Sequence, residues 1–297
     1  MKKVCIGLVA VLVLYILFQW LPYSYDPIEQ QDFMAIAHRG GAALFPENTV
    51  YAFEQSIAMG ADAIEVDIRM SKDGVLLSMH DEDISHYTNH KGKVYDYQAD
   101  ELSLFHFGYY FQNEQGTYCY RDVEDTVRKK MIPMRISDMF SSFQHQVSYI
   151  LEIKEEGERG KECAQKLYQL IVAHGLEKNC YVVSFHKEVM DVFMEINEKG
   201  VFMMMDEERA KQFVVANYIG YNRFFYYAMD GLMLPLKKDD ITLDDDYLIA
   251  KIHAQQKIVF YWCINEEEEI DLLLRKGVDG IISDRIDLLL ERKKHID

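Results

Sequence analysis

Short apolar runs alternate with helical stretches from residue 34 almost to the end of the chain. The apolar runs predict eight strands, at residues 34–37, 63–69, 148–153, 180–184, 201–205, 231–234, 257–263 and 280–283. Helical patterns lie between most of them, for example over residues 158–174, 187–199 and 244–256. Eight strands that alternate with helices favour an α/β protein built as a (β/α)8 barrel, or TIM barrel.

Polar residues gather at the ends of the first two predicted strands. His38 and Arg39 directly follow the first strand, whereas Glu65 and Asp67 lie two residues apart within the second. Two carboxylates at this spacing project from the same face of a strand. An isolated pair of this kind usually marks a solvated strand face. Here the neighbouring histidine and guanidinium favour a functional site at the carboxyl end of the barrel.

A hairpin after the second strand adds another histidine. An Asp-Gly step suits the positive φ angles of a tight turn, and residues 75–79 form the return arm. A two-residue turn would place His80 opposite Asp67, whereas a four-residue loop would place it opposite Glu65. Either register brings the imidazole to the carboxylate pair.

A third carboxylate comes from the strand at residues 148–153. Glu152 and Lys154 lie two residues apart, so their side chains point into the same end of the barrel. A strand-end salt bridge is the simpler interpretation, and such a pair contributes little to stability. Together with Glu65 and Asp67, however, Glu152 completes an all-oxygen site, which suits Mg²⁺ or Ca²⁺ rather than zinc.

The motifs, taken in order, resemble those of the glycerophosphodiester phosphodiesterase family. The matching segments are His38-Arg39-Gly40, Pro46-Glu47-Asn48-Thr49, Ala52-Phe53, Gly60-Ala61-Asp62, Glu65 with Asp67, Asp73-Gly74, His80-Asp81, Leu151 to Lys154, Ser184-Phe185, Trp262 with Asn265, and Gly280 to Asp284. The resemblance spans about residues 34 to 290. It implies a TIM barrel and the same three metal ligands, Glu65, Asp67 and Glu152.

These residues predict metal-dependent hydrolysis of a glycerophosphodiester to an alcohol and glycerol 3-phosphate. His38 and His80 are the expected acid/base pair, because the pKa of histidine suits proton transfer in both directions near neutrality. Arg39 and Lys154 are expected to bind the phosphate. Trp262 is the expected apolar wall for the alcohol, although a buried tryptophan in the barrel core fits its position equally well.

Two other functions fit the same barrel. A phospholipase C-like or D-like enzyme would act on intact lipid, and a degenerate barrel would bind a phosphorylated ligand without catalysis. Pure binding would not require both His38 and His80, which argues against the second alternative.

Residues 82–135 interrupt the alternation of strands and helices, and we expect this insertion to pack over the barrel mouth. His86 stands there where the family commonly has an arginine, so the resemblance does not extend to the substrate's alcohol.

The N-terminal segment is of a different kind. Residues 4–21 contain only Gln19 as a conventionally polar side chain, and as a helix they would span about 27 Å, close to the thickness of a membrane's hydrocarbon core. A cleaved signal peptide is the alternative, but we find no convincing cleavage site. We expect residues 1–25 to form a single-pass anchor in the cell membrane and residues 33–297 to form the phosphodiesterase domain. Lys2 and Lys3 predict that this domain lies outside the cytoplasm.

The charge of the chain excludes one class of partner. A net charge of −17 argues against nucleic acid and against charge-driven docking on anionic lipid. The expected partners are a small glycerophosphodiester and, through the N-terminal helix, the membrane.

No two cysteines of the sequence form a Cys-x-x-Cys pair. Cys180 and Cys263 fall in predicted buried strands, so we expect no required disulfide.

Overall fold

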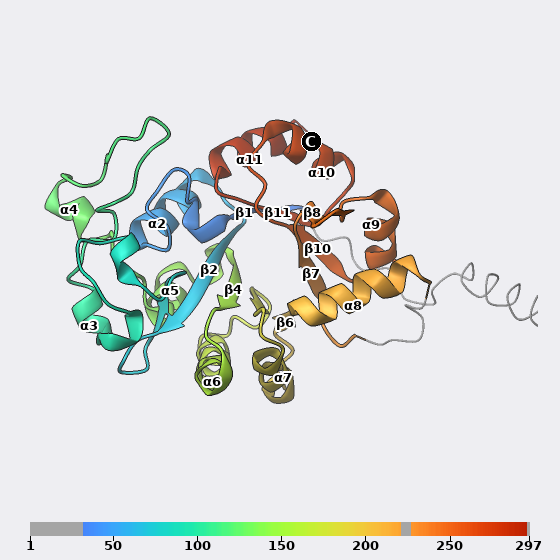
Figure 1. The fold of residues 1–297 in the computed structure, drawn as a ribbon, viewed down its shortest axis with the longest axis horizontal. Helices are drawn as coiled ribbons and strands as arrows, with labels where there is room; N and C mark the ends of the chain where they lie inside the picture. Colours follow the sequence, from blue (N-terminus) through green and yellow to red (C-terminus); the bar gives the residue numbers. More distant parts are fainter. Residues whose placement is uncertain (1–31, 221–226, 296–297) are drawn as a thin grey trace, which may run out of the picture.

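The computed structural model describes residues 32–220 and 227–295. Within these ranges eight parallel strands surround a common axis, and helices cover the outside (Figure 1). The strands are β1 (Met34–Ala37), β2 (Ala63–Met70), β4 (Ser148–Ile153), β5 (Cys180–Val183), β6 (Phe202–Met203), β7 (Gly231–Leu234), β10 (Ile258–Tyr261) and β11 (Gly280–Ser283). Their hydrogen-bonded order is β6-β5-β4-β2-β1-β11-β10-β7. A parallel bridge between Met204 and Gly231 links the two ends of this order, so the predicted TIM barrel is confirmed.

The helices that follow the strands pack against the outer surface of the barrel. They are α2 (Val50–Met59), α5 (Ile136–Phe143), α6 (Gly157–His174), α7 (Lys187–Ile196), α8 (Glu207–Tyr218), α9 (Asp246–His253), α10 (Glu267–Arg275) and α11 (Ile286–Lys293). Local sequence sets the bounds of α2. The Thr49 side chain accepts a hydrogen bond from the Ala52 amide at its start, and Gly60 adopts a positive φ of 100° at its end.

The alternation of side chains along each strand separates two apolar cores. Ile64, Val66 and Ile68 of β2 point outward and pack in the core shared with the helices. Ala63 points inward and joins the smaller core inside the barrel. Glu65 and Asp67 continue this inner face towards the carboxyl end of β2. The barrel interior is therefore apolar towards the amino ends of the strands and acidic at their carboxyl ends.

The hairpin after β2 adopts neither of the predicted registers. Its return strand β3 (Leu76–Ser78) pairs Met70 with Leu76 and Ile68 with Ser78, which leaves a five-residue loop from Ser71 to Val75. The Ser71 side chain bonds to the backbone of Val75 and to Asp73, which stabilises this longer loop. His80 therefore does not face Asp67 or Glu65 across the hairpin, and it reaches the carboxylates from beyond the end of β3.

We expected the insertion to pack over the barrel mouth, but most of it packs beside the barrel, on the side of α2 and α5 (Figure 1). Its ordered segments are η2 (Ile84–His86), η3 (Val94–Asp96), α3 (Ala99–Leu102) and α4 (Asp125–Arg128). Leu77 and Met79 of the β3 arm join Val94, Leu102 and Phe107 in a separate small core. The insertion reaches the barrel mouth where the Tyr87 hydroxyl donates to Glu47.

Two further predictions concern the N-terminus and the cysteines. The predicted anchor lies outside the described residues. No helix among those that the structure describes is long and apolar enough to span a bilayer.

Cys180 is buried as predicted, but the prediction for Cys263 is wrong, because β10 ends at Tyr261 and Cys263 lies exposed beyond it. The remaining elements are a short hairpin of β8 (Lys237–Lys238) and β9 (Ile241–Thr242) and the 3-10 helices η1 (His38–Gly40) and η4 (Gln144–Gln146).

Candidate active site

Three carboxylates converge inside the carboxyl end of the barrel. The parallel register of β2 and β4 places Asp67 beside Glu152, and Glu65 lies two residues earlier on the same face. One oxygen from each of the three lies within 4.8 Å of the others. Their side chains are almost inaccessible, with 2% of Glu65, 1% of Asp67 and 7% of Glu152 exposed. The three predicted metal ligands therefore form one buried cluster.

The cluster carries unbalanced negative charge. Burial, and then the charge of Asp67, raise the pKa of Glu65. Burial also raises the pKa of Glu152, although Lys154 opposes this shift. Burial acts in the same direction on Asp67, but Lys154 and Arg39 outweigh it and lower its pKa. The three carboxylates thus compete for the available positive charge.

Two oxygens of the cluster fit a bound cation. Glu65 Oε1 and Asp67 Oδ1 are buried and receive no hydrogen bond from the residues that the structure describes. Buried carboxylate oxygens ordinarily have a donor or a metal. A set made only of oxygens suits a hard divalent cation. The donor set and the unpaired Glu65 Oε1 therefore fit the metal site predicted from the sequence, whereas Asp67 Oδ1 has Lys154 Nζ at 3.1 Å.

Lys154 and Arg39 border the cluster. Lys154 Nζ lies 3.1 Å from Asp67 Oδ1 and also bonds to Glu152, and these charges raise its pKa although burial opposes this. Arg39 directs its backbone N–H to Glu65 Oε2 at 3.0 Å, and its Nε lies 3.2 Å from Asp67 Oδ2. Both predicted phosphate-binding cations thus lie at the acidic end of the barrel.

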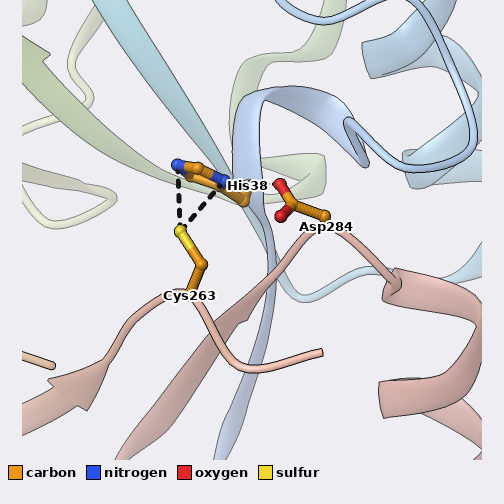
Figure 2. Close-up of side chains that lie close together, drawn as sticks. All are labelled: His38, Cys263 and Asp284. Carbon is orange, nitrogen blue, oxygen red and sulfur yellow. Dashed lines mark hydrogen bonds and ion pairs between the residues drawn. The ribbon is translucent and has the colours of Figure 1, made fainter. Parts of the chain in front are cut away.

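His38 lies beside Asp284 (Figure 2), and its other ring nitrogen faces Glu65 of the carboxylate cluster. Its Nδ1 is 2.6 Å from Asp284 Oδ1, and its Nε2 is 3.8 Å from Glu65 Oε2. An ionised carboxylate can only accept, so Nδ1 carries the proton and Nε2 faces the cluster. Burial opposes the charged imidazole, but Asp284, Cys263 and Glu65 together outweigh it, and the pKa of His38 rises well above its ordinary value. Asn265 Nδ2 holds the other oxygen of Asp284 at 2.8 Å.

His80 has a similar carboxylate partner. Its Nδ1 lies 2.7 Å from Asp81 Oδ1, and His86 Nδ1 lies 2.6 Å from the other oxygen of Asp81. His80 is also close enough to Asp67 and Glu152 for its charge to lower the pKa of each. The structure therefore brings the second predicted histidine to the same cluster.

Trp262 lies at the edge of the site. It is partly buried against the core inside the barrel, and its backbone N–H donates to Leu234 O at 3.0 Å. Its ring meets the exposed ring of Phe185 edge to face, with centroids 6.3 Å apart. Lys154 Nζ lies 5.8 Å from the Phe185 ring centroid. Trp262 thus combines both predicted environments, since it packs on the core and also borders the site.

Several residues that shape the site were not predicted to do so. Asn48 is buried with a positive φ of 56°, and its Nδ2 donates to Asp67 Oδ2 at 2.8 Å. Asp284 follows β11 and Phe185 follows β5, each near a strand's carboxyl end. His38 was predicted as a site residue because it follows the carboxyl end of a strand. The same criterion, applied to every strand, would have identified Asp284 and Phe185.

Comparisons with known proteins show which family the chain matches. The model of the glycerophosphoryl diester phosphodiesterase family matches residues 38–288. A glycerophosphodiester phosphodiesterase of Bacillus altitudinis is 28% identical over 251 residues, which cover 84% of this chain and 93% of that protein.

Solved structures share the fold. A glycerophosphodiester phosphodiesterase from Agrobacterium tumefaciens has a TM-score of 0.67 at 20% identity, covering 87% of this chain and 99% of that one. An Oleispira antarctica phosphodiesterase in complex with the product sn-glycerol-3-phosphate has a TM-score of 0.67 at 18% identity, covering 88% and 96%. The family model spans most of the barrel, and the chain therefore belongs to the glycerophosphoryl diester phosphodiesterase family and is a phosphoric diester hydrolase, as its motifs predicted.

Proposed function

We propose that this enzyme hydrolyses glycerophosphodiesters with a divalent cation held by Glu65, Asp67 and Glu152 and with His38 and His80 as its proton-transfer pair. The observation that carries the proposal is the buried Glu65 Oε1, which has no hydrogen-bond partner among the described residues, with His38 Nε2 3.8 Å from Glu65 Oε2. Mg²⁺ and Ca²⁺ are the proposed cations, because each prefers oxygen ligands.

The cation and the basic residues would share the charge of the phosphate. A bound divalent ion supplies a Lewis acid for the non-bridging oxygens. Lys154 and Arg39 already lie beside Asp67, at 3.1 Å and 3.2 Å, and would add positive charge on the same side. Asn48 holds Asp67 in position through its side-chain amide.

The two histidines would divide the proton transfers. Asp284 favours the protonated form of His38, and this form suits donation to the leaving alcohol oxygen. His80, held by Asp81, would then remove the proton from the attacking hydroxyl. That hydroxyl belongs either to water or to the 2-position of the glycerol, in which case a cyclic phosphate forms first.

Turnover of glycerophosphocholine tests the metal and its ligands. We expect EDTA to abolish activity and Mg²⁺ or Ca²⁺ to restore it. Glu65→Gln and Glu152→Gln should weaken metal binding in calorimetry, because each removes a charged ligand from a buried site. Full turnover in the presence of chelator would exclude the assignment.

A second candidate substrate is intact lipid. The exposed Phe185 ring beside Trp262 offers an apolar surface at the mouth of the barrel. Rates on glycerophosphocholine, lysophosphatidylcholine and phosphatidylcholine, measured side by side, separate the alternatives. The proposed function predicts the highest kcat/KM for glycerophosphocholine, whereas preference for phosphatidylcholine would favour a phospholipase. Binding of each without turnover would favour a binding module.

We also propose that the N-terminal segment anchors the enzyme in the cell membrane with the barrel outside the cytoplasm. The support is the apolar run at residues 4–21 that follows Lys2 and Lys3. Protease added to intact cells should digest the barrel, while a cytoplasmic marker stays intact. Protection of the barrel in intact cells would reverse the orientation.

A further inference from the structure

Cys263, His38 and Asp284 bring three different donor atoms together at the barrel mouth (Figure 2). Cys263 Sγ lies 3.3 Å from His38 Nδ1 and 3.6 Å from its Nε2. The same Nδ1 lies 2.6 Å from Asp284 Oδ1. One donor atom from each residue lies within 4.8 Å of the others. The three residues follow β10, β1 and β11, which are neighbours in the barrel.

This donor set differs in kind from the carboxylate cluster. A thiolate, an imidazole nitrogen and a carboxylate oxygen are the ligands that zinc accepts, whereas Mg²⁺ and Ca²⁺ bind through oxygen. Three protein ligands with an exposed side also leave the fourth position of a zinc tetrahedron to water. Cys263 is solvent-accessible, which gives an ion a route to the three residues.

The distances are close to those of a zinc site. Bonds of about 2.0 Å to nitrogen and oxygen and about 2.3 Å to sulfur give tetrahedral edges of about 3.6 Å for N···S and about 3.3 Å for N···O. The Sγ···Nδ1 separation of 3.3 Å is close to the first of these edges. However, Sγ also lies 3.6 Å from Nε2 and so sits over the ring face, and the Cys263 side chain must rotate towards the Nδ1 lone pair to share an ion with it. The Nδ1···Oδ1 separation of 2.6 Å is a hydrogen bond, so this edge must lengthen as the metal replaces the proton between the two atoms.

We propose that His38, Cys263 and Asp284 form an inhibitory site for zinc or another thiophilic divalent ion, separate from the carboxylate cluster. Inhibition rests on the proposed role of His38 in proton transfer, whereas binding does not. When the ion binds to imidazolium His38 and thiol Cys263, one proton leaves Nδ1 and one leaves Sγ, both to solvent. The imidazole then keeps its Nε2 proton, with its Nδ1 lone pair on the metal, and can no longer exchange protons with substrate near neutral pH.

Inhibition by zinc in the presence of saturating Mg²⁺ tests the site. We expect Zn²⁺ to inhibit glycerophosphocholine turnover by the full-length enzyme. Cys263→Ser should raise the half-inhibitory Zn²⁺ concentration by roughly tenfold or more, because it removes one ligand. Its activity without zinc should stay close to that of the wild type, since serine keeps a hydrogen-bonding group beside His38. Cys119→Ser, which changes another exposed cysteine, is the matched control and should leave inhibition unchanged.

Cobalt supplies a readout that does not depend on activity. Co²⁺ should produce a sulfur-to-cobalt charge-transfer band in the near ultraviolet with the wild type and with Cys119→Ser, and no band with Cys263→Ser. The buried thiols of Cys163 and Cys180 are not accessible to the ion. If the band persists in Cys263→Ser, or if zinc inhibits that variant as strongly as the wild type, the proposal is wrong. A band in an enzyme that does not turn over glycerophosphocholine would support the site while contradicting the proposed function.

Discussion

At the scale of single residues, the two histidines are oriented in the same way. His38 presents Nδ1 to Asp284, and His80 presents Nδ1 to Asp81, at 2.6 Å and 2.7 Å. A carboxylate on Nδ1 fixes the ring and its tautomer, so that Nε2 is the atom left for the substrate. The two carboxylates are therefore positioning residues, and their effect should appear in the pH dependence of the reaction.

Asp284→Asn should shift the pH profile of kcat/KM. The bond to Asp284 raises the pKa of His38 in the native enzyme, so the protonated form persists to higher pH. An amide removes the negative charge and lowers that pKa. The limb that requires protonated His38 should therefore move to lower pH. Asp287→Asn is the control, because Asp287 pairs with Arg285 instead. An unchanged profile in Asp284→Asn would remove Asp284 from the account.

Spacing within one strand was enough to predict that Glu65 and Asp67 lie side by side, but not which residues hold the side chains of the site in place. Glu65 and Asp67 share a face because they are two residues apart, and this rule needs no tertiary information. Asp284 meets His38 across 246 residues of sequence, and Asn48 meets Asp67 only because its backbone adopts a positive φ. Contacts of these two kinds depend on the closed barrel and on turn geometry, which apolar periodicity does not report.

At the scale of elements, the turn after β1 sets the positions of His38 and Arg39. Arg39 and Gly40 adopt positive φ values of 51° and 78°. A Cβ on Gly40 would lie 2.9 Å from the Ala52 Cβ and 3.0 Å from a Phe53 ring carbon, both in α2. The turn is thus pressed against the helix that follows it, and only glycine fits this approach.

Gly40→Ala should destabilise the fold and impair catalysis. The left-handed backbone and the clash with α2 together should cost about 2 to 4 kcal/mol in the free energy of unfolding. Gly60→Ala is the matched control, since Gly60 has a φ of +100° but no atom within 4 Å of the added Cβ, and it should cost only about 1 to 2 kcal/mol. Denaturant unfolding and turnover measure both effects. Equal losses in the two variants would contradict the close packing of Gly40.

The β2–β3 hairpin shows where prediction of elements failed. Its two strands were predicted from apolar residues, and both are present. The register was wrong because the loop contains five residues, stabilised by the Ser71 side chain, rather than an Asp-Gly turn alone. A side chain that bonds to the backbone of its own turn can change loop length without any change in hydrophobic pattern.

At the scale of the whole molecule, the barrel was the most predictable feature. Most residues of its strands are apolar on both faces, and Glu65, Asp67 and Glu152 interrupt this pattern at the carboxyl end. The insertion was less predictable, because its own small core and short helices leave no long periodic segment. Its position beside α2 depends on contacts with β3 rather than on local sequence.

The net charge of −17 predicts weak attraction to anionic lipid once the N-terminal segment is removed. In residues 1–29, Lys2 and Lys3 balance Asp26 and Glu29, so a chain that begins at Gln30 keeps the same net charge. It should be soluble and active, and it should not sediment with phosphatidylglycerol vesicles at low salt. The full-length chain, reconstituted in the same vesicles, is the control. Sedimentation of the shorter chain would reveal a second membrane contact on the barrel.

The central claim is that His38 and His80 act as one acid/base pair beside a metal held by three carboxylates. Turnover of glycerophosphocholine by His38→Ala, His80→Ala and the double variant, at saturating metal, tests it most directly. Each single variant should lose about 100-fold to 10,000-fold in kcat with folding and metal affinity retained, and the double variant should lose less than the product of the two. A single variant that kept more than about a tenth of wild-type kcat, with chemistry limiting the rate, would contradict the claim.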